Sequence, residues 1–168
     1  MTPAECIFRD AGAGDEAVLV DMLYFAVFVP PAMPPPPKTI VAEPEIARYV
    51  RGWGRRGDDG TIAMTVDGRA IGAAWLRLWA DDDCGYGFID VRTPELSVAV
   101  GPEFRGRGVG TTLLRHVLQR ADASYESVSL SVSIQNPAVR LYKRLGFVVV
   151  AADDAALVMK RQAALPDA

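Results

Sequence analysis

The clearest pattern along the chain is a strict alternation of polar and apolar residues over positions 127–134. Serine occupies every second position there, and a period of two is typical of a β-strand with one buried face. Upstream, a set of apolar residues recurs at helical spacing: Val109, Leu113, Leu114, Val117 and Leu118. This set predicts a helix over residues 108–123 with one buried stripe.

A β-hairpin is expected before this helix. Residues 61–66 and 69–79 have strand character, and they flank Asp67-Gly68, a pair that accepts the positive φ angles of a two-residue turn. A polar loop that contains glycine follows over residues 81–87, and it is a candidate for lining a site.

The other elements follow from periodicity and from residues that begin or end helices. Six prolines within residues 30–37 exclude a helix or a central strand, because proline lacks an amide donor and fixes φ. We expect an extended connection there. Asn136 and Pro137 suit a helix start, and Gly146 suits its end. The remaining elements are strands over residues 6–9, 95–100, 147–151 and 156–160, and helices over residues 15–28 and 45–53.

In chain order the elements read βααβββαβαββ, which predicts a mixed α/β sheet sandwiched by helices. The chain has 168 residues and half of them are apolar, so we expect one domain over residues 1–168.

Composition and charge narrow the class of protein. The formal charge of −3 gives no global reason to expect nucleic acid or an anionic membrane as partner, so a small or cationic partner fits better. Two cysteines and one histidine, without metal-ligand spacing, predict neither a metal site nor a disulfide framework. No export signal or membrane span is readable, and a cytoplasmic location is expected.

The strongest candidate for chemistry is the segment from Arg105 to Gly110, between an apolar strand and an amphipathic helix. A helix that begins behind closely spaced glycines presents unpaired amides, and glycine lets a phosphate approach the backbone. Arg105 and Arg107 add positive charge and Thr111 adds a hydroxyl donor, so a diphosphate fits better than one carboxylate. A Walker-type loop is excluded because no Gly-Lys-Ser/Thr follows. The dinucleotide motif is excluded because it needs a further glycine at Thr111 or Leu113.

Two sequence blocks resemble the GNAT superfamily of acyl-CoA-dependent N-acetyltransferases. Residues 96–110 read LSVAVGPEFRGRGVG and are similar to that family's strand, acyl-CoA loop and helix start. Residues 136–147 read NPAVRLYKRLGF and are similar to its Asn-x-x-Ala-x-x-x-Tyr-x-x-x-Gly-Phe region, with Ala138 one position early. The resemblance implies a GNAT-like, mostly antiparallel sheet of about seven strands flanked by about four helices.

The resemblance also implies how acetyl-CoA is held as acyl donor. Amides of the glycine segment would bind the CoA pyrophosphate, strand backbone would pair with the pantetheine arm, and Asn136 would contact that arm. An amide of Val98 or Ala99 would stabilise the negative oxygen of the tetrahedral intermediate. The implied cofactor-binding residues are Val98, Ala99, Val100, Arg105, Gly106, Arg107, Gly108, Val109, Gly110, Thr111 and Asn136.

Direct acetyl transfer to an amine needs a neutral nucleophile and a protonated leaving thiol. Tyr142 matches the usual proton donor of the family. Glu95, at the start of the strand over residues 95–100, is the candidate general base, acting directly or through a water. Asp90 or an aspartate within residues 81–83 is the alternative base.

Other interpretations remain open from the sequence. The chain also fits a non-catalytic acyl-CoA-binding or regulatory domain, an acyltransferase that uses another acyl-CoA, or an interaction module that displays residues 34–37 as a polyproline helix. We expect the acceptor to be a small-molecule or peptide amine, without a recognisable substrate signature. A homodimer is compatible with the resemblance, but the sequence contains no interface pattern.

Overall fold

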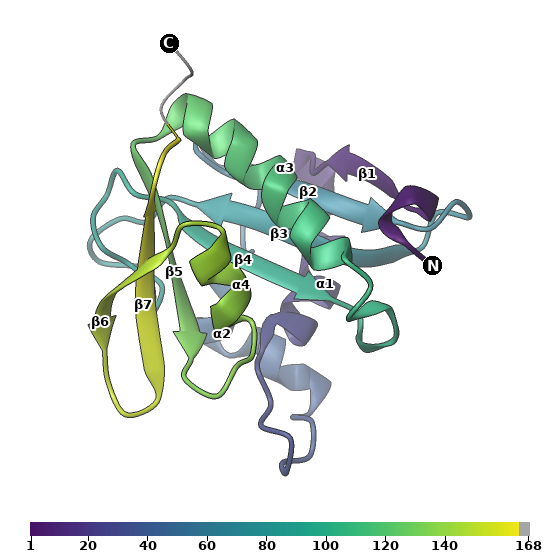
Figure 1. Ribbon diagram of the computed structural model, residues 1–168, viewed down its shortest axis with the longest axis horizontal. Coiled ribbons are helices and arrows are strands. Elements are labelled where there is room, and N and C mark those ends of the chain that lie inside the picture. Colours follow the sequence, from purple (N-terminus) through teal and green to yellow (C-terminus); the bar gives the residue numbers. More distant parts are fainter. Residues whose placement is uncertain (165–168) are drawn as a thin grey trace.

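Seven strands form one sheet in the computed structural model, which describes residues 1–164 (Figure 1). The strand order is β1-β2-β3-β4-β5-β7-β6, and neighbouring strands are antiparallel except for the parallel pair β4 and β5. The predicted mixed α/β sheet and the predicted order of elements are confirmed. The strands are β1 (Ile7–Asp10), β2 (Asp59–Met64), β3 (Ala70–Arg77), β4 (Glu95–Val100), β5 (Ser127–Ser133), β6 (Val148–Ala152) and β7 (Ala156–Gln162), and the helices are α1 (Glu16–Ala26), α2 (Pro44–Ala47), α3 (Val109–Ser124) and α4 (Val139–Arg144).

Helices cover both faces of the sheet, with α3 and α4 in front and α1 and α2 behind in Figure 1. Strand β3 contributes to both cores. Ala74 and Leu76 belong to the apolar cluster under α3, whereas Ala73 and Trp75 belong to the cluster under α1. Successive strand residues point to opposite faces, so a strand covered on both sides is apolar without alternation. Among residues 1–164, no helix is both long and apolar enough to cross a bilayer.

The predicted hairpin joins β2 and β3, but its loop has three residues instead of two. The Thr65 amide donates to the Arg69 carbonyl at 2.8 Å, and the Gly68 amide donates to the Thr65 carbonyl at 3.0 Å. Gly68 has a φ of +89°. A left-handed residue at this place closes a three-residue hairpin loop through a bulge, so the glycine has the expected conformation in a different type of turn.

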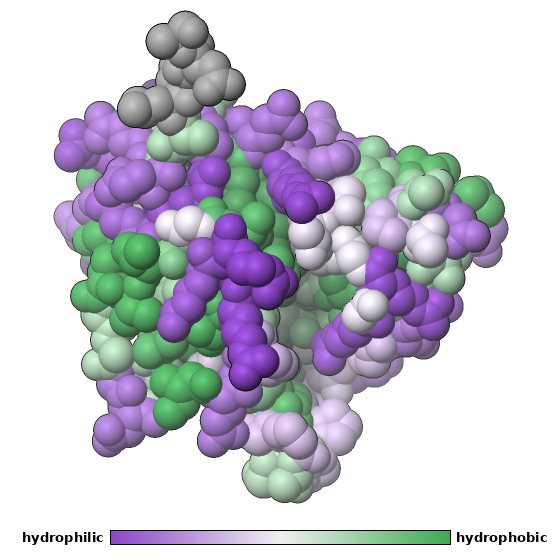
Figure 2. All heavy atoms as spheres, in the orientation of Figure 1, coloured by the Kyte–Doolittle hydropathy of each residue, from purple (hydrophilic) through white to green (hydrophobic). Residues whose placement is uncertain are grey.

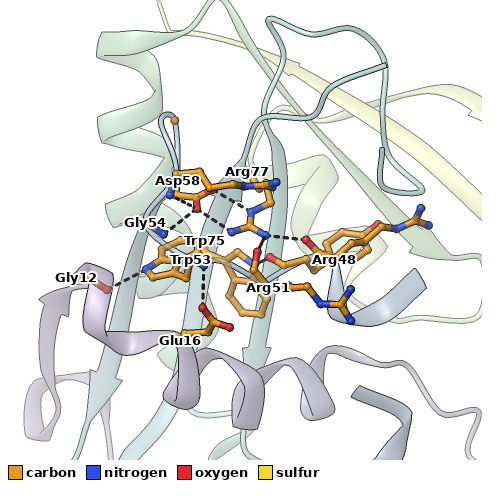
Figure 3. A network of polar contacts seen from close by, with 12 residues as sticks. Gly12, Glu16, Arg48, Arg51, Trp53, Gly54, Asp58, Trp75 and Arg77 are labelled. Atoms are coloured by element: carbon orange, nitrogen blue, oxygen red, sulfur yellow. Dashed lines mark hydrogen bonds and ion pairs between the residues drawn. The ribbon is translucent and has the colours of Figure 1, made fainter. Parts of the chain in front are cut away.

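The second helix is shorter than predicted, because α2 ends at Ala47 and the prediction covered residues 45–53. The chain continues as turns to Gly52, which has a φ of +66°. Arg77 Nη1 donates to the carbonyls of Arg48 and Arg51 at 2.7 and 2.9 Å (Figure 3). Since a side chain satisfies these carbonyls, they need no helical amide partners.

Arg77 and Asp58 form a buried ion pair that anchors this turn region to β3. Both side chains are 1% exposed, and two contacts of 2.8 and 3.0 Å join the guanidinium to the carboxylate. Asp58 also accepts hydrogen bonds from the amides of Gly54 and Arg55, and the guanidinium lies over the Trp53 ring (Figure 3). The network therefore fixes the chain that follows α2.

Replacing Asp58 by alanine is expected to lower the free energy of unfolding by about 3–5 kcal/mol, because it leaves the Arg77 guanidinium buried without its counterion. Denaturant titration followed by tryptophan fluorescence measures this change. Asp154→Ala, at an exposed position, is the matched control, with an expected change below about 0.5 kcal/mol. Equal losses in the two variants would contradict a stabilising role for the ion pair.

The serine face of β5 is more buried than the alternation predicted. Ser127 and Ser129 are 6% and 0% exposed, because residues 85–93 cross this face. The Thr93 and Ser127 hydroxyls lie 3.1 Å apart, and a Cβ added at Gly87 would lie 2.8 Å from the Ser131 amide nitrogen. The loop therefore packs directly on the first half of the strand.

Candidate active site

Strands β4 and β5 separate along their length (Figure 1). Within residues 1–164 their pairing is limited to Glu95 with Ser129, next to a hydrogen bond of 3.0 Å from the Ser129 amide to the Pro94 carbonyl. A cavity of about 620 Å³ extends from this opening along the starts of α3 and α4. Figure 2 shows a recess in this region with apolar atoms inside it.

The hydrogen bonds of β4 determine which backbone groups face the cleft. The Gly101 amide donates to a carbonyl of β3 at 2.8 Å. In an antiparallel pair every second residue directs its amide and carbonyl to the partner, so the Ala99 amide also faces β3. The amides of Val98 and Val100 therefore face the cleft. Arg105 Nε reaches the Val100 carbonyl from that side at 2.9 Å. Of the two predicted oxyanion donors, the geometry favours Val98.

The glycine segment forms one end of the cavity. Gly106 and Gly108 have φ angles of +70° and +84°, and Gly108 is the N-cap of α3. The amides in the first turn of a helix lack partners within the helix and attract anions. All predicted cofactor-binding residues except Arg107 line the cavity, and Arg107 is exposed.

Arg105 and the proline connection complete the wall of this cavity. The Arg105 guanidinium is tied to the Val100 carbonyl and, at 3.3 Å, to the Phe25 carbonyl, so it joins the glycine segment to β4 and to α1. The Tyr24 hydroxyl donates to the Pro36 carbonyl at 2.8 Å, and Pro36 lines the cavity. This placement favours a structural wall over a displayed polyproline ligand.

A second cavity, of about 270 Å³, adjoins the first. The end of α1, the turn after α2, Tyr86 and the later serines of β5 line it. The two cavities share six lining residues, namely Ala26, Val27 and Phe28 at the end of α1 together with Val98, Asn136 and Tyr142. We call the place lined by Val98, Asn136 and Tyr142 the junction. A group bound in one cavity meets a group bound in the other at this point.

Packing holds Tyr142 at the junction. The residue is 8% exposed, and its ring meets the Phe147 ring edge-to-face with centroids 5.9 Å apart. Burial raises the pKa of Tyr142 to about 12, so the hydroxyl keeps its proton at neutral pH. Asn136 Oδ1 accepts a hydrogen bond of 2.9 Å from the Ala138 amide, which fixes the Asn136 side chain at the start of α4.

Glu95 lies where β4 and β5 meet, and its carboxylate is almost fully enclosed. The residue is 3% exposed and lines the second cavity. Oε1 accepts hydrogen bonds from the Tyr49 hydroxyl at 2.8 Å and the Gly87 amide at 2.9 Å, and Oε2 accepts one from Trp79 Nε1 at 2.8 Å. Burial raises the pKa of Glu95, and these donors, Tyr49 first, oppose the rise.

Comparison with known proteins identifies the family. Residues 31–147 match the family model described as the acetyltransferase (GNAT) family, which covers more than half of the chain. The chain belongs to the GNAT acetyltransferase family.

Known relatives of this GNAT chain agree in sequence and fold. An N-acetyltransferase of Methanocaldococcus jannaschii, itself uncharacterized, is 32% identical over 108 residues, which cover 60% of this chain and 45% of the relative. The chain therefore spans less than half the length of the curated relatives it matches. A putative acetyltransferase from Salmonella typhimurium, solved with its cofactor acetyl-CoA, has a TM-score of 0.63, 24% identity, and coverage of 97% of this chain and 98% of that chain. A GCN5-related N-acetyltransferase from Kribbella flavida has a TM-score of 0.67, 20% identity, and coverage of 96% and 99%.

The alternative bases considered from the sequence of this GNAT chain lie in other surroundings. Asp90 Oδ1 accepts hydrogen bonds of 2.9 Å from the amides of Arg92 and Thr93, and the Arg92 amide is the main cause that lowers the pKa of Asp90. Residues 81–83 are exposed and do not line either cavity. Glu95 is the carboxylate that the structure brings to the second cavity.

Sequence reasoning missed three residues of this GNAT site, namely Tyr49, Trp79 and Tyr86. Tyr86 belongs to the loop over residues 81–87, which was a candidate for lining a site. This loop could therefore have led to Tyr86 from the sequence. Tyr49 and Trp79 contact Glu95 from 46 and 16 residues away. No local pattern marks such distant contacts.

Proposed function

We propose that this protein transfers the acetyl group of acetyl-CoA directly to a primary amine. The observation that carries the proposal is the junction, where the cleft beside the glycine segment meets the cavity beside Glu95. One cavity then holds the donor and the other the acceptor, with the reacting atoms between Val98 and Tyr142.

The donor cleft fits a CoA thioester. A Cβ added at Gly106 would meet no atom within 4 Å, so the backbone there is open to a diphosphate. The amides of Thr111 and its neighbours at the helix start supply donors, and the cleft-facing groups of Val98 and Val100 suit an extended arm paired like a strand. Bound acetyl-CoA supplies an activated thioester carbonyl.

Replacing Gly108 by alanine is expected to weaken acetyl-CoA binding about tenfold, equivalent to ~1.4 kcal/mol. Gly108 has a φ of +84°, which costs an L-residue about 1–2 kcal/mol, and the new Cβ would lie 3.2 Å from Pro3 Cγ. The strain displaces the helix start that holds the phosphates. Titration calorimetry measures the dissociation constant.

Gly14→Ala is the matched control for this substitution. Gly14 has no left-handed φ, and a Cβ there would meet no atom within 4 Å. Acetyl-CoA affinity that is the same in Gly108→Ala and Gly14→Ala would place the phosphate site elsewhere.

Three groups of the protein each have one role in the reaction. The Val98 amide donates a hydrogen bond to the carbonyl oxygen as negative charge develops there. Tyr142 acts as general acid, because its raised pKa keeps the hydroxyl protonated until a basic thiolate forms beside it. Glu95 acts as general base and is the final acceptor of the amine proton.

The acceptor cavity suits a small amine that arrives as a cation. Its walls combine apolar residues such as Leu23, Ile46 and Val132 with serines of β4 and β5, and Glu95 is the carboxylate among its lining residues. The C-terminal end of α1 lines the same cavity and carries partial negative charge. The carboxylate and the helix end both favour an ammonium group, and the mixed walls fit a body with polar and apolar parts.

The experiment that tests the proposal measures free CoA thiol during incubation with acetyl-CoA and a panel of alkylamines, amino acids, polyamines, aminoglycosides and peptides. We expect thiol release that depends on the amine, with N-acetylated product identified by mass spectrometry. Absence of acetyl-CoA binding at millimolar concentration would refute the proposal. Binding without thiol release for any amine would favour a non-catalytic acyl-CoA-binding domain, and faster release from a longer acyl-CoA would identify a different donor.

A further inference from the structure

The Glu95 carboxylate cannot reach an amine by itself. Both lone pairs of Oε1 are used, by the Tyr49 hydroxyl and the Gly87 amide. Oε2 is bonded to Trp79 Nε1, and backbone covers it so closely that a Cβ added at Gly85 would overlap this oxygen. Proton transfer from a bound amine to Glu95 therefore needs an intermediary group.

Tyr49 is in position to be that group. Its hydroxyl donates to Glu95 Oε1 at 2.8 Å and accepts a hydrogen bond of 2.7 Å from the Tyr86 amide. A phenol oxygen has two lone pairs, so one remains for a further donor. Tyr49 also lines the acceptor cavity, and its ring is held edge-to-face against Trp79 with centroids 5.2 Å apart.

We propose that Tyr49 relays the proton of the acceptor amine to Glu95, an inference that rests on the proposed acetyl transfer. The ammonium N–H bond breaks as Tyr49 Oη takes that proton. The original Tyr49 O–H bond breaks as Glu95 Oε1 takes the second proton. Tyr49 is neutral before and after the step, the ammonium becomes a neutral amine, and the carboxylate becomes a carboxylic acid.

The surroundings favour movement of both protons together. Burial, followed by the charge of Glu95, raises the pKa of Tyr49, so no phenolate is held between steps. The titratable groups that line the cavity are Glu95, Tyr49, Tyr86 and Tyr142. Arg48 lies over the Tyr86 ring at 5.2 Å and adds the positive charge at this site.

The test is Tyr49→Phe, which removes the hydroxyl and keeps the ring contact with Trp79. We expect kcat/KM for the amine to fall about 10²-fold with an unchanged dissociation constant for acetyl-CoA, and the melting temperature to fall because two hydrogen bonds of the hydroxyl are lost. The unaltered enzyme should reach a constant rate above the pKa of Glu95. The variant should gain about tenfold in rate per pH unit up to the pKa of the free amine, because it depends on neutral amine from solution.

Two further variants separate a relay from a structural role. Tyr125→Phe removes a partly buried hydroxyl outside both cavities and should retain the activity of the unaltered enzyme. Incorporation of 3-fluorotyrosine at position 49 keeps a hydroxyl and should restore the constant-rate region of the pH profile.

Several outcomes would overturn the relay. Tyr49→Phe with an unchanged kcat/KM, or with a reduced one and an unchanged pH profile, would refute it while leaving acetyl transfer intact. A fluorotyrosine variant that behaves like Tyr49→Phe would also refute it. Absence of thiol release by the unaltered enzyme would instead overturn the proposed function, and the relay with it.

Discussion

Tyr142→Phe is expected to reduce kcat by about 10²- to 10³-fold while acetyl-CoA binds with nearly unchanged affinity. The substitution deletes one hydroxyl from the junction and keeps the ring, which packs against Phe147. Because burial alone raises the pKa of Tyr142, the hydroxyl stays protonated at the junction, where the proposed reaction releases the CoA thiolate. Without it, the CoA thiolate must leave unprotonated or take a proton from water.

Single-turnover thiol release separates this effect from product dissociation, and calorimetry gives the acetyl-CoA affinity. Tyr125→Phe is again the control for loss of a hydroxyl outside the site. A Tyr142→Phe variant with the kcat of the unaltered enzyme would remove Tyr142 from the mechanism. A loss of acetyl-CoA affinity equal to the loss of rate would make Tyr142 a binding residue instead of an acid.

Glu95→Gln is expected to lower kcat/KM for the amine by at least about 10²-fold and to move the acidic limb of the pH–rate profile from the pKa of Glu95 to the pKa of the free amine. The base works only when ionised, so the rate of the unaltered enzyme should fall as pH drops through the pKa of Glu95. Burial raises this pKa above the ordinary value of 4.5. Glutamine cannot accept the proton, so its residual rate should follow the pKa of the free amine.

The raised pKa of Glu95 also changes how the free energy of unfolding depends on pH. A carboxyl whose pKa is higher in the folded state contributes stability below its unfolded pKa, and this contribution is lost as pH rises through the folded pKa. The unaltered protein should therefore gain stability relative to Glu95→Gln as pH falls through that range. Glu126→Gln, at an exposed position, is the control.

In the rate measurement, an unchanged acidic limb of the pH–rate profile in Glu95→Gln would exclude Glu95 as the base.

Local patterns were sufficient for most of the fold. The alternation over residues 127–134 predicted a strand and the apolar stripe from Val109 to Leu118 predicted a helix, and both elements are confirmed, although the serine face of the strand is more buried than the alternation indicated. The prediction for residues 45–53 was wrong in extent. The carbonyls after α2 bind the Arg77 guanidinium, which comes from a strand 26 to 29 residues away, and helical periodicity contains no information about that contact.

The candidate site also has a part that neighbouring residues determine and a part that contacts between distant residues determine. The glycine segment and the start of α3 are consecutive in sequence, so their position together at one end of the larger cavity was predictable from the sequence. The environment of Glu95 was not, because Tyr49, Trp79 and Gly87 approach it from three separate segments. Sequence reasoning named the carboxylate but not the partners that enclose it, and in the proposed relay those partners decide how a proton reaches it.

The two cavities are lined by different kinds of groups, and this difference affects how substrate specificity can change during evolution. The proposed donor side depends on backbone groups of β4 and of the start of α3, which most substitutions leave in place. The proposed acceptor side has its own lining from the turn after α2 and the loop with Tyr86, which do not line the larger cavity. Mutations in these two segments are therefore expected to change which amine is accepted while use of the same donor is inherited intact.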